Sequence, residues 1–460
     1  MSLIKSISGI RGTFGGNAGE NLTPVDIVAF SAAYGQWLKK QDTKNLKIII
    51  GRDARPSGEI VNNLVTGTLM AMGFNIIDLG LSTTPTVEMA VVNHNASGGI
   101  ILTASHNPVS WNALKLLNNK GEFISAAAGK EILDMASNQS FQFETIENIG
   151  NKSNDDEALI FHINKIKALK WVNVDAIKNA NFSVAFDAVN SSGGIAIPLL
   201  LKELGVQNII PLYDEPNGKF PHNPEPLPAH LTEIMNVVKN SNADVGFVVD
   251  PDVDRLAIIA EDGSYFGEEY TLVAIADYLL SKEQSTTVSN LSSSRALADI
   301  SKKHGCKYVA SAVGEVNVVL KMKEVNAKIG GEGNGGIIYP ELHYGRDALV
   351  GIALFLSYMA EKQEKVSEIK ASYPIYYMAK EKVQLTPQIN LNEILKKLAE
   401  QYQSQPQNNI DGLKIEFDNG WVHLRKSNTE PIIRVYTEHI TKVGSEQLAN
   451  TFVNQVNSLI

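Results

Sequence analysis

Three aspartates at alternate positions carry the most specific chemical signal in the sequence. Asp250, Asp252 and Asp254 directly follow the apolar run VGFVV, which predicts a strand. Carboxylates this close repel one another, so we expect a cation among them. Hard oxygen ligands suit Mg²⁺ or Ca²⁺, and Mg²⁺ is usually held by a few carboxylates plus a phosphate oxygen. An EF-hand is excluded because Arg255 stands where that loop needs glycine. The alternative is a solvated acidic turn, which needs at most one or two such residues.

A serine follows another apolar run, GIIL, in the segment TASHNP. Ser105 is therefore expected on a loop at the carboxyl end of a strand, where open α/β sheets bind ligands. The sequence lacks the Gly-x-Ser-x-Gly elbow of hydrolases around this serine. His106 is a candidate neighbour, with an ordinary polar turn residue as the equal alternative. Lys115 follows closely, and a lysine in a closed cleft can have its pKa lowered enough to exchange protons, although most lysines are solvated.

Two further clusters contain groups that bind phosphates and hydroxyls. Near the carboxyl end of the chain, guanidinium, hydroxyl and amide groups follow a predicted strand and can grip a phosphate dianion; they are Arg425, Ser427, Asn428, Thr429 and Arg434. The run Gly330–Gly336 places Glu332 and Asn334 among glycines, which suits a ligand bearing hydroxyl groups. A solvated turn and a glycine-rich hairpin turn are the respective alternatives.

Other polar residues are expected to have scaffolding or local roles. Arg52, Asp53 and Arg55 predict a salt-bridged turn that positions the loop of the first domain, and Asp347 predicts the cap of a helix beginning at Ala348. Arg11, flanked by glycines in SGIRG, adds a further cation near the start of the chain.

Short β-branched runs alternate with helical patterns and predict α/β layers with mainly parallel sheets. This alternation occurs three times without a repeat at the level of residues. The predicted strands are Lys47–Gly51, Asn75–Gly80 and Gly99–Ser105, then Ser183–Ala188, Asn208–Asp214 and Val245–Asp250, then Thr286–Leu291, Lys307–Val313 and Gly336–Tyr339.

The pattern changes after Pro374. Apolar runs flank Asp418, Asn419 and Gly420, which predicts a hairpin, and amphipathic stretches at 391–402 and 445–459 predict helices. We therefore expect three α/β domains at 1–150, 151–256 and 257–370, followed by an α+β domain at 371–460. The Asn-rich stretch 135–156 is interpreted as a boundary that contains a loop.

Composition narrows the function classes. The chain has 460 residues, and 41 Lys and Arg against 50 Asp and Glu give a net charge of −9, which argues against a nucleic-acid or anionic-lipid partner. The single Cys306 excludes metal sites built on paired cysteines within this sequence. The first residues lack a signal-peptide pattern, and the longest apolar stretch is too short for a membrane span, so a cytoplasmic protein is expected.

Taken in order, these motifs resemble the α-D-phosphohexomutase family of phosphoglucomutases, phosphomannomutases and phosphoglucosamine mutases. SGIRG resembles the opening loop, TASHNP the phosphoserine loop, DPDVDR the metal loop, GEGNGG the sugar loop and RKSNTEP the phosphate-binding loop. The resemblance covers the whole chain and implies four domains around a central cleft.

The resemblance also implies a mechanism. Ser105 would carry a phosphoryl group and complete a Mg²⁺ shell with Asp250, Asp252 and Asp254. Phosphate would pass between O6 and O1 of a hexose through a 1,6-bisphosphate intermediate. Lys115 would act as general acid/base, with Arg11 and His106 stabilising charge. Substrate would be bound by Arg255, Glu332, Asn334, Arg425, Ser427, Asn428, Thr429 and Arg434.

The sugar remains open at the level of sequence. Bacterial phosphoglucosamine mutases usually read GEQSGH in the sugar loop, whereas this chain has Asn334 and Gly336 in place of serine and histidine. We expect glucosamine 6-phosphate as substrate, with mannose or glucose phosphate as the alternative, in a monomer or homodimer. A phosphosugar-binding regulator without turnover is the alternative from another class, and the presence of Ser105, the three aspartates and Lys115 argues against it.

Overall fold

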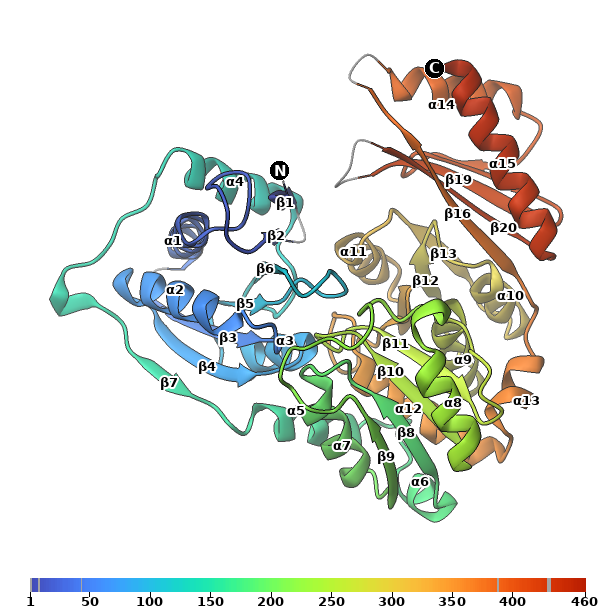
Figure 1. Ribbon diagram of the computed structural model, residues 1–460, viewed down its shortest axis with the longest axis horizontal. Helices are drawn as coiled ribbons and strands as arrows, with labels where there is room; N and C mark the ends of the chain where they lie inside the picture. Colours follow the sequence, from blue (N-terminus) through green and yellow to red (C-terminus); the bar gives the residue numbers. More distant parts are fainter. Residues whose placement is uncertain (1, 7–8, 43, 387–388, 428–431) are drawn as a thin grey trace. The chain divides into compact units, whose positions relative to one another are not determined.

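The computed structural model describes residues 2–6, 9–42, 44–386, 389–427 and 432–460 (Figure 1). The chain forms two compact units. The first contains Met1–Tyr278 and Asn334–Lys370, and the second contains Leu279–Gly333 and Ala371–Ile460. Within the described part of the chain, no helix is long and apolar enough to cross a membrane.

The first unit begins with a seven-stranded mixed sheet in the order β1-β2-β6-β5-β3-β4-β7. Its strands are β1 (Ile4–Ser6), β2 (Gly9–Thr13), β3 (Lys47–Arg52), β4 (Asn75–Leu81), β5 (Gly98–Leu102), β6 (Trp111–Leu117) and β7 (Lys152–Asn154). The helices of this region are α1 (Pro24–Gln41), α2 (Gly58–Ala71), α3 (Thr84–Asn93) and α4 (Ala126–Ser137). The strands β5, β3, β4 and β7 pair in parallel, and α2 crosses between β3 and β4 as predicted.

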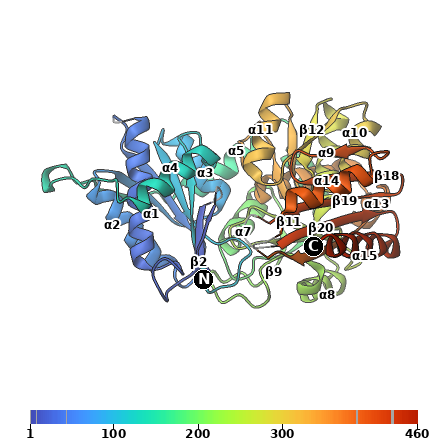
Figure 2. The same cartoon turned by 90° about the horizontal axis from the view of Figure 1, so that it is seen from above.

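Three successive isoleucines in β3 show how the sheet is covered on both faces. Ile48 and Ile50 belong to the core with α1, α2 and α4, whereas Ile49 points into a second core with α3. Because side chains alternate along a strand, such a run is buried on both sides only if helices cover both faces. Figure 2 shows α1 and α2 together on one side of the blue strands.

The loop-containing boundary expected at 135–156 also holds regular structure. Helix α4 continues to Ser137, and β7 pairs in parallel with β4 at the edge of the first sheet. All three residues of β7 are exposed and none is a large apolar residue. A period-two pattern could not identify such a short, solvated edge strand.

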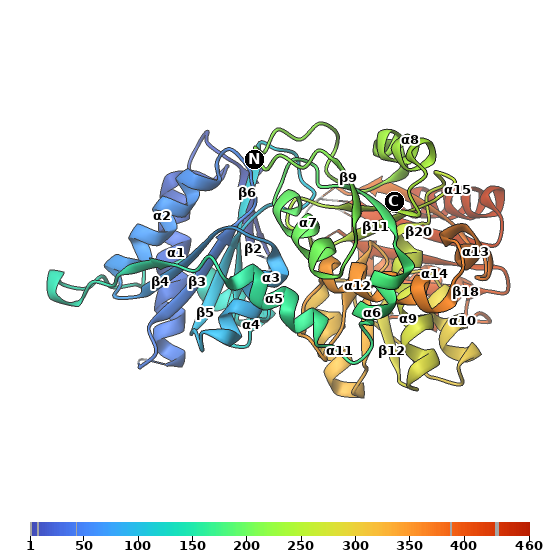
Figure 3. The same ribbon diagram turned by 90° about the horizontal axis from the view of Figure 1, so that it is seen from below.

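The second sheet of this unit has the order β11-β10-β8-β9. Its elements are β8 (Ser183–Asp187), β9 (Asn208–Leu212), β10 (Val245–Val249), β11 (Leu256–Ala260), α5 (Ala158–Lys167), α6 (Val174–Ala180), α7 (Gly193–Glu203) and α8 (Thr232–Ser241) (green in Figure 3). Strands β9, β8 and β10 are parallel, and β11 returns antiparallel to β10. The metal-loop motif is the connection between β10 and β11.

The remaining elements of the first unit belong to its later segments. They are α9 (Glu268–Lys282), which ends beyond the unit boundary, β15 (Gly336–Ile338), α12 (Ala348–Lys362) and α13 (Val366–Ala371). Every residue of α12 from Ala348 to Met359 is buried. Asp347 caps this helix as predicted, since its Oδ1 accepts the N–H groups of Leu349 and Val350.

The second unit holds a parallel group of strands and an antiparallel sheet. The first comprises β12 (Thr287–Asn290), β13 (Tyr308–Ser311) and β14 (Ile329–Glu332) with α10 (Ala296–Lys303) and α11 (Glu315–Val325). The second has the order β16-β20-β19-β18-β17. It comprises β16 (Tyr377–Gln384), β17 (Gln407–Asn408), β18 (Leu413–Phe417), β19 (Gly420–Lys426) and β20 (Ile432–His439), with α14 (Leu391–Gln401) and α15 (Lys442–Leu459) packed on it (Figure 1).

The predicted hairpin joins β18 to β19, with Phe417 paired to Gly420. Asp418 and Asn419 therefore form the two-residue turn, and Gly420 already belongs to the strand. A Cβ on Gly420 would lie 2.0 Å from the carbonyl oxygen of Glu438. The glycine is required by this close strand packing and not by the turn conformation.

Candidate active site

Ser105 lies on the loop after β5 in a strained backbone conformation. Its φ is +49°, a region that costs a residue with a side chain about 1–2 kcal/mol. The backbone N–H of Ser105 donates to Thr103 Oγ1 at 2.9 Å. The hydroxyl donates to Asp250 Oδ2 at 2.7 Å. The fold thus places the serine of one predicted motif against the first aspartate of another, and strain of this kind is typical of functional loops.

The guanidinium group of Arg55 fixes the position of the loop that carries Ser105. The residue is 1% exposed, its Nε donates to Asp53 Oδ2 at 2.9 Å, and its two terminal nitrogens donate to backbone carbonyl oxygens. Those acceptors are Ser105, Asn107, Pro108 and Trp111. The salt-bridged scaffolding turn predicted from the sequence is confirmed.

Replacing Arg55 with Met should destabilise the protein by about 3–5 kcal/mol, because Asp53 and four carbonyl groups would lose their buried donor. Urea denaturation followed by circular dichroism measures this change. Arg52→Met is the matched control: Arg52 is half-buried, and its guanidinium donates to Asp53 O over a long distance of 3.3 Å. Equal destabilisation by the two variants would contradict the scaffolding role of Arg55.

The loop between β10 and β11 brings three carboxylates together. Asp250, Asp252 and Asp254 are each 0% exposed, and one oxygen of each lies within 4.8 Å of the others. Asp250 Oδ1 accepts the N–H groups of Asp254 and Arg255, and Thr84 at the start of α3 donates its hydroxyl to Asp252 Oδ2 at 2.6 Å. Strand β10 and helix α3 therefore fix the orientation of these side chains.

This carboxylate cluster fits a divalent cation. Asp252 Oδ1 and Asp254 Oδ1 are buried and accept no hydrogen bond from the residues that the structure describes. Burial, and then the charges of Asp254 and Asp252, hold the pKa of Asp250 well above its ordinary value. Val253 between them has φ +61°, which is rare for a β-branched residue. Unsatisfied buried carboxylate oxygens are the donors that Mg²⁺ or Ca²⁺ requires.

Cationic side chains surround the same carboxylates. Lys115 Nζ lies 2.6 Å from Asp252 Oδ2 and 3.3 Å from Asp254 Oδ2, and Arg255 Nε lies 3.9 Å from Asp250 and Asp254. Burial would lower the pKa of Lys115, but the two carboxylates outweigh it and raise that pKa above its ordinary value. The expectation of a lowered lysine pKa is wrong for these surroundings, because it considered burial without the paired charges.

His106 and Arg11 stand at the edge of this cluster. His106 Nδ1 lies 3.4 Å from Ser105 Oγ. The charge of Arg255, then burial, then Arg11 lower the pKa of His106 well below its ordinary value, so the ring is neutral at pH 7. Burial, and then the charges of Arg255 and Arg346, lower the pKa of Arg11, which places its guanidinium near theirs.

Arg346 is a residue of this cluster that the sequence analysis did not identify. It is 7% exposed, and its Nη2 donates to Asp254 Oδ2 at 2.7 Å. A Cβ on Gly336 would lie 2.3 Å from Arg346 Cδ, so glycine at that position leaves the space that the arginine side chain occupies. The sequence analysis noted glycine at position 336 of the sugar loop but did not connect it with Arg346, which lies ten positions further along the chain.

Strand pairing brings together the residues of the second unit that were predicted to bind phosphate. Arg425 and Arg434 are directly opposite each other on β19 and β20, and Ser427 Oγ lies 3.5 Å from Arg434 Nε. Like charges directly opposite are destabilising unless an anion joins them. Arg425 Nε is buried and donates no hydrogen bond within the described residues. Asn428 and Thr429 lie outside the described residues.

The two candidate sugar-binding residues have different surroundings. Glu332 at the end of β14 is 6% exposed, and its Oε1 accepts Asn290 Nδ2 at 2.9 Å and the N–H of Gly314 at 3.2 Å. Asn334 is half-buried, and its Oδ1 accepts the N–H of Gly336. These contacts orient the carboxylate and the amide, and their role in sugar binding stays a prediction.

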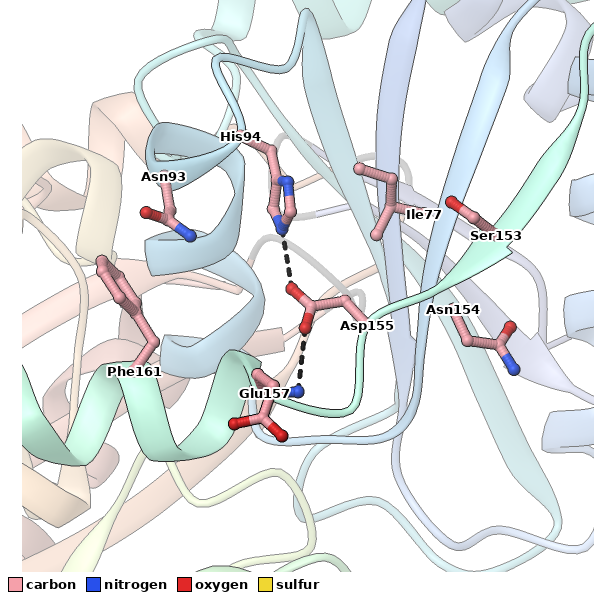
Figure 4. Close-up of a pocket in the computed structure, with 8 residues that line it drawn as sticks. All are labelled: Ile77, Asn93, His94, Ser153, Asn154, Asp155, Glu157 and Phe161. Carbon is pink, nitrogen blue, oxygen red and sulfur yellow. Dashed lines mark hydrogen bonds and ion pairs between the residues drawn. The ribbon is translucent and has the colours of Figure 1, made fainter.

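A shallow pocket of about 460 Å³ occurs elsewhere in the first unit, between the end of α3, β7 and the start of α5. His94 Nε2 and Asp155 Oδ2 lie 2.7 Å apart across it, and Asp155 also accepts the N–H of Glu157 (Figure 4). Asp155 is thus engaged by His94 and by the backbone of Glu157. They are not the residues that surround Ser105.

Family models match four consecutive parts of the chain. They are described as the α/β/α domains I, II and III and the C-terminal domain of phosphoglucomutase/phosphomannomutase, and they match residues 3–143, 161–263, 267–376 and 380–455. The chain belongs to the phosphoglucomutase/phosphomannomutase family. It is therefore a phosphohexomutase, an isomerase, as the resemblance indicated.

Individual relatives agree with this membership. The chain is 34% identical to a phosphoglucomutase/phosphomannomutase of Thermococcus kodakarensis, over 93% of this chain and 94% of the relative. It is 31% identical to a phosphoglucosamine/phosphogalactosamine mutase of Sulfurisphaera tokodaii, over 100% and 99% of the two chains. A solved family structure from Burkholderia thailandensis shares the fold with a TM-score of 0.86 at 23% identity, covering 99% of this chain and 97% of that one. The expected four-domain α/β fold is confirmed.

Proposed function

We propose that the protein moves phosphate between O6 and O1 of a hexosamine through phospho-Ser105, converting glucosamine 6-phosphate to glucosamine 1-phosphate. The observation that carries this proposal is the hydrogen bond from the Ser105 hydroxyl to a buried carboxylate in a cluster of three. A serine in such surroundings has a base and a cation site at hand, which an ordinary turn serine lacks.

Charge complementarity supports phosphoryl transfer at Ser105. Three cationic side chains, Lys115, Arg255 and Arg346, lie against the three carboxylates, and the charge of Arg11 acts on the two arginines. A transferring phosphoryl group spreads negative charge over its oxygens, and fixed cations stabilise that charge without reorganisation. These fixed cations therefore suit a phosphorylated serine that faces a phosphosugar.

Asp250, Asp252, Asp254 and the phosphate of phospho-Ser105 would hold Mg²⁺ in this proposal. When bound, the ion neutralises charge on the phosphoryl oxygens and helps align the group for displacement. Lys115 already contacts two of these carboxylates and is the candidate general acid/base for the attacking hydroxyl. Arg11 and neutral His106 stabilise charge beside Ser105.

The proposed reaction consists of two phosphoryl transfers. A sugar hydroxyl attacks the phosphorus of phospho-Ser105, the bond to Oγ breaks, and a hexose 1,6-bisphosphate forms while the proton passes to Ser105. Ser105 Oγ then attacks the phosphorus on O6, the bond between phosphorus and O6 breaks, and the serine proton passes to O6, which releases glucosamine 1-phosphate and regenerates the phosphoenzyme. Arg425, Ser427 and Arg434 bind the phosphate that is not transferred, which suits two arginines placed opposite each other, one of them with a buried Nε that donates to none of the described residues. Glu332 and Asn334 recognise hydroxyls.

The choice of glucosamine is supported by relatives named phosphoglucosamine mutase, among them the chain of Sulfurisphaera tokodaii. Glucose or mannose phosphate is the second candidate, favoured by the name of the Thermococcus kodakarensis relative. Turnover of glucosamine, glucose and mannose 6-phosphates, measured with catalytic bisphosphate and Mg²⁺ present, separates them. We expect kcat/KM for glucosamine 6-phosphate to be at least about tenfold higher, equivalent to about 1.4 kcal/mol. A preference for mannose or glucose phosphate would overturn the assignment of the sugar.

A further inference from the structure

A second buried cluster of side chains that can bind a metal ion lies where α3, α5 and the start of α12 meet (Figures 1 and 3). It contains His162 of α5 together with His343 and Asp347 from the segment before α12. His162 Nε2 lies 2.9 Å and His343 Nε2 lies 3.3 Å from Asp347 Oδ2. One atom of each residue lies within 4.8 Å of the others, and the three side chains are 0%, 9% and 0% exposed.

The far nitrogen of each imidazole is already engaged by a partner outside this triangle. His343 Nδ1 lies 3.1 Å from Glu88 Oε2, which is an ion-pair distance. His162 Nδ1 lies 3.0 Å from Thr86 Oγ1. Histidines that bind metals are oriented in this way, with the second nitrogen donating to a carboxylate or another acceptor.

The two carboxylate oxygens of Asp347 also have separate partners. Its Oδ1 accepts the N–H groups of Leu349 and Val350 as the cap of α12. Its Oδ2 faces the two Nε2 atoms. Two nitrogens and one oxygen thus converge from two segments, and the distances of 2.9 and 3.3 Å are close to the edge of about 3.3 Å expected between ligands bound at 2.0–2.1 Å.

Charge also favours a cation at this centre. Glu88 and Asp347 are 1% and 0% exposed, so two carboxylates are buried beside two imidazoles whose rings lie 6.1 Å apart. A single divalent ion balances both carboxylates and leaves both imidazoles neutral.

We propose that His162 Nε2, His343 Nε2 and Asp347 Oδ2 bind a divalent ion of the zinc type, with Glu88 and Thr86 orienting the imidazoles. Two histidines and a carboxylate with a fourth coordination position are a common donor set for Zn²⁺. The site is separate from the three aspartates near Ser105, and its existence does not depend on the proposed mutase reaction.

The ion joins segments that also contact the metal loop. Helix α3 carries Glu88 and Thr86, and Thr84 at its start bonds to Asp252. Ala348, next to Asp347, donates its N–H to Val253 O at 3.2 Å. Zinc bound here therefore links α3, α5 and α12 beside the loop that holds Asp250, Asp252 and Asp254.

Zinc content after equilibration of the full-length protein with Zn²⁺ and dialysis tests the site. We expect one equivalent to be retained by the wild-type protein and by Asp252→Asn, and to be lost from His162→Gln and His343→Gln. Glu88→Gln keeps all three ligands and should weaken zinc binding by about 10–100-fold. Co²⁺ in place of Zn²⁺ should give the strong visible absorption of a four-coordinate site containing nitrogen ligands.

Three results would overturn the proposal. They are the absence of retained zinc in the wild-type protein, retention that is unchanged in both histidine variants, and loss of zinc caused by Asp252→Asn alone. The cluster would then be held together by protons. Circular dichroism establishes whether each variant folds, and if the histidine variants do not fold, the Co²⁺ spectra and zinc affinities of wild type and Glu88→Gln decide the question.

Discussion

Ser105→Ala should lower mutase activity by more than about 10⁴-fold and abolish phosphorylation of the protein. The proposed reaction has no other acceptor for the phosphoryl group, and removal of a covalent nucleophile typically has an effect of this size. Turnover of glucosamine 6-phosphate measures the first effect. Intact-mass spectrometry measures the second, as the disappearance of a species heavier by one phosphate.

Two further variants make this test specific. Ser105→Gly also removes the hydroxyl but relieves the positive φ, so it should be equally inactive and at least as stable as Ser105→Ala. Ser110→Ala changes an exposed serine of the same loop and should leave activity and phosphorylation unchanged. Retained turnover in both Ser105 variants would show that phosphate does not pass through this residue.

Asp252→Asn should reduce kcat/KM by at least about 10²-fold and raise the Mg²⁺ concentration needed for half-maximal activity. The substitution keeps the shape of the side chain but removes one of three negative charges that would hold the ion, and such ions supply several kcal/mol of transition-state stabilisation. Activity measured over a Mg²⁺ titration gives both quantities.

Folding must be separated from metal binding in this variant, because Asp252 also accepts hydrogen bonds from Thr84 and Lys115. Asparagine retains an acceptor for both, so we expect only a modest change in thermal stability. Asp262→Asn is the matched control, since this exposed aspartate accepts the N–H of Ser264 in a nearby turn. An unchanged Mg²⁺ requirement in Asp252→Asn would contradict the assignment of the carboxylates.

The parts of the site that follow one strand could be predicted from the sequence. Asp250 comes directly after β10 and Ser105 shortly after β5, and apolar runs followed by polar residues show where strands end. The opposed pair Arg425 and Arg434 was recognised as a cationic cluster before its register was known. Local patterns therefore identified the groups that flank single strands.

Contacts between distant segments could not be predicted in this way. Arg346 reaches Asp254 over 92 positions of sequence, and His162 reaches Asp347 over 185. Nothing in the periodicity of either segment specifies the partner. The direction of the Lys115 pKa shift failed for the same reason, since burial and ion pairing act in opposite directions and only the structure shows which carboxylates are near.

The burial of α12 along twelve consecutive residues limits how the protein can evolve. A helix enclosed on all sides cannot slide or rotate. The positions of the residues immediately before it are therefore fixed as firmly as those of residues in the protein interior. Arg346 and Asp347 occupy those positions. A single insertion or deletion between them and Ala348 would turn them by about 100° relative to the helix. It would disrupt both the cluster of three aspartates, which Arg346 contacts, and the histidine cluster that contains Asp347. Lineages of this chain should therefore vary in length elsewhere and keep this junction free of gaps.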